Sequence, residues 1–192
     1  MPAPNSAALN FLLTRRSRPA KTLTGPVPDD AVLRTILEAA ARTPDHGKLE
    51  PWRFVVYERP ALLRLSEAVV EFSAGRGIEA ERVEKMARQF ADGQLAVMVV
   101  SSPKPSEKIP EIEQVLSSGA VCLALLNAAL ASGWGANWLT GWAVHDPAFR
   151  TAHLGLDAHE TVAGIVHLGT ETAVPPERPR PDLDAITEWV RT

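Results

Sequence analysis

The sequence has little cysteine, no long hydrophobic run and no strong excess of charge. Cys122 is the only cysteine, which excludes an intrachain disulfide and a cysteine-based metal cluster and favours a reducing, cytoplasmic setting. The longest apolar run, 120–131, is interrupted by Asn127 and is shorter than a bilayer span requires. A formal net charge of -3 provides no basic field for nucleic acid or an anionic membrane. We therefore expect neither a nucleic-acid nor a membrane partner.

Several motifs of catalysis and nucleotide binding are also missing. The sequence contains no G-x-G-x-x-G after a strand pattern, no G-x-x-x-x-G-K-[ST], no H-E-x-x-H and no G-x-S-x-G. Its 5 histidines are scattered without the spacing of metal ligands, so no metal site is predicted. Residues 1–10 lack the charged start and apolar stretch of a secretory signal. Hydrolase and metalloenzyme functions therefore have no positive support.

The remaining composition suits one folded domain. The chain has 192 residues, of which 45% are hydrophobic and 22% are charged, and this length is sufficient for a sizeable core. We find neither repeats nor a linker, so a single domain over 1–192 is expected.

Hydrophobic periodicity predicts helices separated by a few strands. The expected helices cover 6–13, 29–42, 60–71, 78–90, 111–132, a short segment from Pro147, and one or two turns within 184–190. The expected strands cover 53–57, 95–100 and 161–168, and the Pro-rich segment 174–181 is expected to be extended. This order predicts an α+β fold, a sheet covered by helices.

A basic cluster, Arg15-Arg16-Ser17-Arg18, follows the first predicted helix. Guanidinium groups beside a hydroxyl offer the fixed donors that a phosphate requires. A solvated basic turn at a helix end explains the same residues, and charge runs are more often of that kind.

The segment 43–54 joins a predicted helix to a predicted strand, where binding groups often collect. His46 could hydrogen-bond the edge of a heterocycle, since a neutral imidazole offers one donor and one acceptor. A loop histidine bonded to nearby backbone is the alternative. Trp52 in the same segment is expected in the core.

The third candidate segment, 133–142, is rich in glycine and carries three tryptophans. Glycine allows the backbone to approach a ligand closely, and indoles provide flat apolar surface. The segment could therefore line an aromatic cofactor. A helix C-cap followed by core aromatic residues is an equally good explanation of the composition.

Taken together, these segments resemble the nitroreductase family over nearly the whole chain. The resemblance lies in the order of four motifs: Arg-Arg-Ser at 15–17, the A-R-T-P-D-H-G-K-L-E-P-W-R-F segment at 41–54, Leu-Gly-Thr at 168–170 and Arg-Pro-Arg-Pro at 178–181. The short length and the Pro-Asp-His variant are similar to a compact single-domain bacterial subgroup, the NAD(P)H nitroreductase type.

The resemblance implies a central, mostly antiparallel sheet flanked by helices, in an interlocked homodimer with FMN between the subunits. Arg15 and Ser17 would hold the FMN phosphate, with Arg16 nearby. Residues of the other two segments would complete the site, with Arg42 and His46 approaching from the other subunit, and Trp138, Leu139 and Thr140 lining the flavin. The helix segment 120–131 would lie in the dimer core.

Two features depart from relatives of this type. Leu139 stands where compact relatives can carry Arg, which removes one possible contact. Arg178 and Arg180 stand in the tail where larger relatives carry basic residues that bind the phosphate. We expect these tail arginines to compensate for Leu139, although a Pro-rich tail could also leave them solvated.

The implied reaction is ping-pong. NADH or NADPH reduces the flavin at N5, and an oxidised small molecule such as a nitroaromatic or quinone then takes the electrons. The protein positions and tunes the cofactor, and Arg16 or Arg42 would stabilise its reduced form. Two alternatives remain at this point: a non-catalytic module that stores or delivers FMN, and a flavin enzyme with a different reaction.

Overall fold

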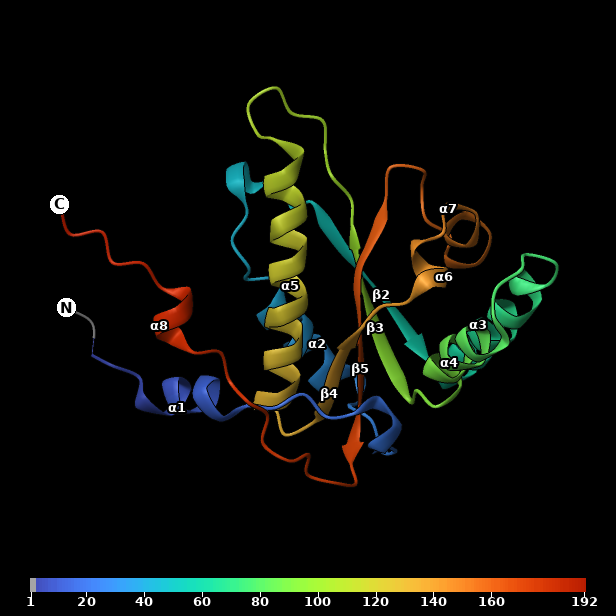
Figure 1. Cartoon of the computed structure of the whole chain (residues 1–192), viewed down its shortest axis with the longest axis horizontal. Coiled ribbons are helices and arrows are strands. Elements are labelled where there is room, and N and C mark those ends of the chain that lie inside the picture. Colours follow the sequence, from blue (N-terminus) through green and yellow to red (C-terminus); the bar gives the residue numbers. More distant parts are fainter. Residues whose placement is uncertain (1–2) are drawn as a thin grey trace.

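A computed structural model describes residues 3–192 as one antiparallel sheet with helices against both faces (Figure 1). The longer helices are α1 (Ser6–Thr14), α2 (Asp30–Ala40), α3 (Arg59–Ser73), α4 (Ala80–Ala91) and α5 (Glu111–Ala131). Short helices are α6 (Trp142–His145), α7 (Pro147–Phe149), α8 (Leu183–Ile186), η1 (Ala20–Thr22), η2 (His46–Lys48) and the π-helical η3 (Arg150–Leu154). The strands are β1 (Leu23–Thr24), β2 (Trp52–Glu58), β3 (Leu95–Ser101), β4 (Gly135–Leu139) and β5 (Thr161–Glu171).

The sheet is built around β3 and β5. Strand β3 pairs with β2 on one side and β5 on the other, so Val97 lies opposite both Val56 and Val166. Strand β4 pairs with β5, and the two-residue β1 pairs with the end of β5 at Glu171. Every pairing is antiparallel, which confirms the α+β architecture expected from the sequence.

Two hydrophobic cores lie on the two faces of the sheet. All seven residues of β3 are buried, and successive side chains alternate between the faces. Val97 and Val99 contribute to the core with α2 and α5, while Ala96 and Met98 contribute to the core with α3 and α4. This division explains why β3 is apolar throughout rather than alternating.

Helix α5 packs on β3, β4 and β5, with α2 beside it. By length and composition alone it could cross a membrane, with mean hydropathy 1.7, but its buried side chains form the centre of the α2–α5 core. The second half, expected in a dimer core, lies largely within the core of its own chain. Most of the large exposed apolar side chains of α5 lie in its first half, before residue 120. They are Ile112, Val115 and Leu116, and Leu123 follows in the second half.

The segment 133–142 differs most from expectation, because its middle residues, 135–139, form strand β4 rather than a loop. Gly135 pairs with Gly169 of β5, and a Cβ on Gly135 would lie 2.5 Å from Leu23 Cδ2. The glycine therefore allows β1 to pass close to the strand. Strand β5 likewise continues to Glu171, so Leu168-Gly169-Thr170 lies inside the strand rather than after it.

The two ends of the chain extend away from the sheet (Figure 1). Helix α1 has no buried residue, and Leu9, Leu12 and Leu13 are all more than half exposed. Helix α8 is one turn long, and Trp189 beyond it is 74% exposed. The final helix is thus at the short end of the one or two turns expected within 184–190, and its residues are exposed.

Candidate functional site

The basic cluster after α1 is attached to the sheet rather than left in solvent. The backbone N–H of Arg18 donates to the Ala136 carbonyl of β4 at 2.8 Å. Arg15 Nη2 donates to Ser17 Oγ at 3.1 Å, and both residues are partly buried. The sheet therefore holds two of the residues expected to bind a phosphate beside each other.

The C-terminal tail brings a further arginine to this cluster. Burial, and then the nearby charges of Arg180, Arg16 and Arg18, lower the pKa of Arg15. Arg180 is 165 positions after Arg15 in the sequence, so only the folded chain places the two cations together. We name Arg15, Arg16, Ser17, Arg18 and Arg180 the arginine cradle.

Two carboxylates contact the arginine cradle. Arg180 Nη2 lies 2.8 Å from Glu177 Oε1, and Arg16 Nη1 lies 3.5 Å from the same oxygen. Arg18 pairs with Glu171 of β5. Four guanidinium groups thus face two carboxylates, which leaves the cradle with an excess of two positive charges.

Arg15 carries an unused donor. Its Nε is buried and has no hydrogen-bond partner within residues 3–192. A buried guanidinium donor without an acceptor is costly, so the cradle is suited to an additional anion. Arg178 is placed differently. Its backbone N–H donates to Glu177 Oε1 at 3.0 Å, and the residue is exposed.

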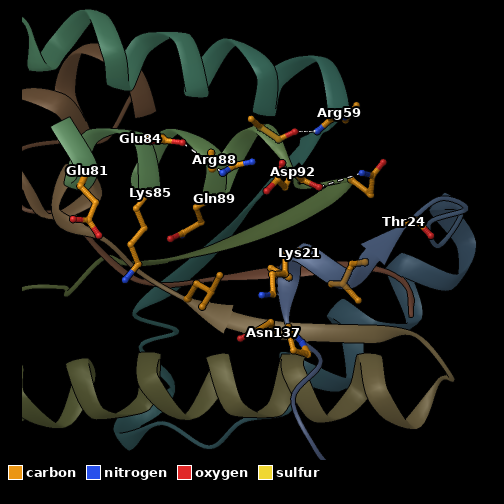
Figure 2. Close-up of a pocket in the computed structure, with 16 residues that line it drawn as sticks. Lys21, Thr24, Arg59, Glu81, Glu84, Lys85, Arg88, Gln89, Asp92 and Asn137 are labelled. Carbon is orange, nitrogen blue, oxygen red and sulfur yellow. Dashed lines mark hydrogen bonds and ion pairs between the residues drawn. The ribbon is translucent and has the colours of Figure 1, made fainter. Parts of the chain in front are cut away.

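Figure 2 shows the residues that line a pocket of about 1020 Å³, and this lining includes Pro19, which directly follows Arg18 of the cradle. The pocket is open to solvent and is lined by η1 and β1, by α4, and by β4. Figure 2 shows Lys21 and Lys85 extending toward it from opposite sides, with Gln89 between them and Asn137 on the strand below. Leu139 also lines the pocket.

The alternation of β4 separates the residues expected to line one ligand. Ala136 belongs to the core on the α5 face, so Trp138 points to that face while Asn137 and Leu139 point to the pocket. The indole of Trp138 lies over Gly164 of β5, where a Cβ would be 1.9 Å from its Nε1. Thr140 follows the strand and is exposed.

Some of the cationic groups around the pocket have protein partners and others have none within the described residues. Arg59 donates to the carbonyls of Ala91 and Gly93, the latter at 2.6 Å. Lys21 and Lys85, by contrast, form no ion pair within the described part of the chain. Gln89 Nε2 is buried without a partner there. The pocket therefore offers at least three unused donors to a ligand.

His46 lies at the other end of α5. Its Nδ1 is 2.6 Å from Glu113 Oε2 in the first turn of that helix, and its loop is fixed where Ser117 Oγ donates to the Pro44 carbonyl at 3.0 Å. A helix of 21 residues is about 31 Å long, and the arginine cradle lies beyond its opposite end. Exposed Arg42 belongs to the same loop region, so within one chain neither residue reaches the cradle.

Sequence reasoning identified the cradle but missed most of the pocket. Lys21, Lys85, Gln89 and Asn137 stand in no recognisable motif, and they come together because η1, α4 and β4 meet at one face of the sheet. Glu177 was also missed. The one available signal for it was an acidic residue beside the two arginines of the tail.

Comparison with known proteins identifies the family of the chain. A family model described as the Nitroreductase family matches residues 12–170. A protein of Haemophilus influenzae named as an NAD(P)H nitroreductase is 38% identical over 168 residues, which cover 85% of this chain and 88% of that protein. YdjA of Escherichia coli, also named as an NAD(P)H nitroreductase, is 32% identical over 163 residues, or 85% and 87% of the two chains.

Solved structures share the fold at lower identity. A nitroreductase-like protein of Bacillus cereus has a TM-score of 0.80 and 23% identity, covering 99% of this chain and 98% of its own. A nitroreductase of Desulfovibrio desulfuricans, solved in complex with FMN, has a TM-score of 0.73 and 21% identity, covering 99% and 100%. The FMN- and NADPH-dependent nitroreductase NfnB of Sphigopyxis sp. has a TM-score of 0.73 and 18% identity, covering 96% and 99%. The match of the family model to most of the chain, together with these relatives, establishes that the chain belongs to the nitroreductase family.

Proposed function

We propose that the protein is a cytoplasmic FMN-dependent oxidoreductase. It passes electrons from NADH or NADPH to an oxidised small molecule, such as a nitroaromatic or a quinone, in a ping-pong reaction. The names of the relatives support the nicotinamide reductant, and the FMN complex of the Desulfovibrio desulfuricans structure supports the cofactor.

The arginine cradle is the observation that carries this proposal. A phosphate monoester has close to two negative charges at neutral pH, which match the excess charge of the cradle. Arg15 would donate through its unpartnered Nε, and the Ser17 hydroxyl would add a donor. Arg180 would act from the tail and supply the cation that Leu139 does not.

The adjoining pocket would hold the ring system of FMN. When bound, FMN supplies the acceptor for a hydride and the donor of electrons to the second substrate. Leu139 would contact the apolar surface of the ring. Lys21, Lys85 and Gln89 would donate hydrogen bonds to its polar edge, and the two ammonium groups would favour negative charge there. Arg16 and Arg42, first expected in this tuning role, do not line the pocket.

We further propose a homodimer in which the two copies of α5 lie antiparallel. The exposed stripe Ile112, Leu116 and Leu123 would form its centre. An antiparallel arrangement would place the start of one α5, with His46 and Arg42, near the end of the other, where the arginine cradle lies. The partner would thereby complete each site. Helix α1 and the C-terminal tail would pack on the partner. This contact would cover the exposed leucines of α1 and Trp189 of the tail.

The proposal is tested by loading the purified chain with FMN and following NADH and NADPH oxidation with and without an acceptor. FMN binding, reduction by either nucleotide and reoxidation by a nitroaromatic or quinone are expected. An FMN-bound protein that neither nucleotide reduces would indicate the storage module. A chain that takes up no FMN would reject the proposal.

A further inference from the structure

The C-terminal tail places a carboxylate among the arginines that the proposed function assigns to the FMN phosphate. Glu177 Oε1 lies 2.8 Å from Arg180 Nη2 and 3.5 Å from Arg16 Nη1. The backbone N–H of Arg178 donates to Oε1 at 3.0 Å. Two guanidinium groups and one peptide donor therefore converge on one anionic group.

These are the donors that a phosphate would use. Arginine forks bind carboxylate and phosphate oxygens with the same geometry, so the two anions compete for one set of N–H groups. The N–H of Arg178, followed by the charges of Arg180 and Arg16, lowers the pKa of Glu177, and the carboxylate is negative at neutral pH.

Glu177 is also easily displaced. Its side chain is 68% exposed, so the carboxylate can return to water at little desolvation cost. Residues 172–182 form neither helix nor strand, and the tail can move without breaking a helix or a sheet. Arg15 has no carboxylate within ion-pairing distance in the described chain and remains available for the incoming anion.

We propose that Glu177 is an intramolecular competitor of the FMN phosphate. It holds Arg16 and Arg180 when FMN is absent and sets the affinity of the protein for phosphorylated flavin. This inference rests on the proposed function, because it requires the phosphate to bind at the arginine cradle. It goes further by assigning an opposing role to an acidic residue of the tail.

Competition by Glu177 should affect the binding of FMN but not that of riboflavin. Neutralising Glu177 removes the ion pairs of Arg180 and Arg16, while Arg16 Nη1 keeps its hydrogen bond to the Pro176 carbonyl. The change should tighten FMN binding about twofold to fivefold, the range expected for exposed ion pairs. Riboflavin has the same ring system but no phosphate, so its affinity should stay unchanged. The gain for FMN should shrink at high salt, because the charges are exposed to solvent.

The experiment compares wild type, Glu177→Gln and the matched control Glu188→Gln. Glu188 is an exposed glutamate of the same tail that forms no ion pair within residues 3–192. Dissociation constants of the full chain for FMN and for riboflavin are measured by flavin fluorescence at low and high salt. Tighter FMN binding by Glu177→Gln alone, with unchanged riboflavin binding, is the expected result.

Three results would overturn the inference. Unchanged FMN affinity of Glu177→Gln shows that the carboxylate does not compete. Weaker FMN binding shows that Glu177 instead orients the arginines. An equal gain for riboflavin shows an effect on tail docking rather than on the phosphate. Wild type that binds no FMN at all would reject the proposed function itself.

Discussion

At the scale of single residues, the arginine cradle assigns different roles to neighbouring arginines. Arg15 is partly buried with an unused Nε, while Arg18 is paired with Glu171. Arg180 lies close enough to Arg15 for its charge to lower the pKa of Arg15, and Arg178 is exposed. Identical side chains thus differ in what they can offer to a phosphate.

Substitution of these arginines should rank them. Arg15→Ala and Arg180→Ala should each weaken FMN binding by about 1.5–3 kcal/mol, or roughly tenfold to a hundredfold, because each removes a charged donor. Arg18→Ala and Arg178→Ala should cost much less. Titration of the four variants with FMN measures the order, and equal losses for all four would show a diffuse field instead of a site.

His167 of β5 is a second residue with a separable effect. It is buried, neither ring nitrogen has a hydrogen-bond partner within residues 3–192, and burial lowers its pKa to about 4. In the unfolded chain the His167 imidazole binds a proton near pH 6.5, whereas in the folded chain it stays neutral at that pH. The stability linked to His167 is therefore present above pH 6.5 and is lost progressively as the pH falls toward 4.

Urea unfolding at pH 7 and pH 4.5 measures this effect. Wild type should lose on the order of 2–3 kcal/mol from His167 over this interval, and His167→Gln should lose correspondingly less. Exposed His159→Gln is the control and should follow wild type. Glu160, whose pKa the Arg53 hydrogen bond lowers to about 2, loses its contribution mainly at lower pH and does not obscure the test.

At the scale of elements, strand β4 positions the site through its contacts with β5. Its alternation directs Asn137 and Leu139 to the pocket and Trp138 to the opposite face, over Gly164. The indole occupies the space where a side chain on residue 164 would stand. The position of the Trp138 indole therefore depends on the glycine at position 164 of the neighbouring strand.

Gly164→Ala should destabilise the fold by about 1–3 kcal/mol, because the new methyl group collides with a rigid indole. In a Trp138→Ala background the same change should be nearly neutral, and chemical denaturation of the four variants closes the cycle. Gly25→Ala is the control, since Gly25 is exposed outside the helices and no heavy atom lies within 4 Å of a Cβ there. A similar cost of Gly164→Ala in both backgrounds would contradict the role assigned to Trp138.

At the scale of the whole molecule, the described chain leaves apolar surface uncovered on α1, on α5 and in the C-terminal tail. Leu116 on α5 is 66% exposed, Leu13 on α1 is 69% exposed and Trp189 in the tail is 74% exposed. Large exposed apolar side chains on several elements are found at interfaces between chains. The proposed homodimer covers it and brings His46 toward the partner's cradle.

Leu116→Glu should therefore convert the dimer into monomer, because it buries two carboxylates at the centre of the α5 contact. Sedimentation velocity at micromolar concentration reports the change, and FMN affinity should fall with it because the site is shared. Leu63→Glu provides the control on α3, on the opposite face of the sheet, where the side chain is 42% exposed. A monomeric wild type that binds FMN tightly would refute the shared site.

The sequence by itself determined much of the secondary structure and the family. Buried strands at 95–100 and 161–168 and the helix over 111–132 were predictable because long apolar patterns have only one favourable placement. The Arg-Arg-Ser motif could be proposed as a phosphate site because its chemistry is local, and this role stays a prediction. Strand β4 was not predictable, since its Gly135 accommodates Leu23 and the backbone of β5, which are distant in sequence.

Only the tertiary structure decided how the candidate site is assembled. It joined Arg180 to Arg15 across 165 positions, and it set Glu177 against both Arg16 and Arg180. It also brought Lys21, Lys85 and Asn137 from three elements around one pocket. Periodicity reports which face of an element is buried, but the contacts between faces depend on how the sheet and its helices pack. The sequence therefore specified the donors, and the packing of α4, β4 and the tail decided which of them lie together.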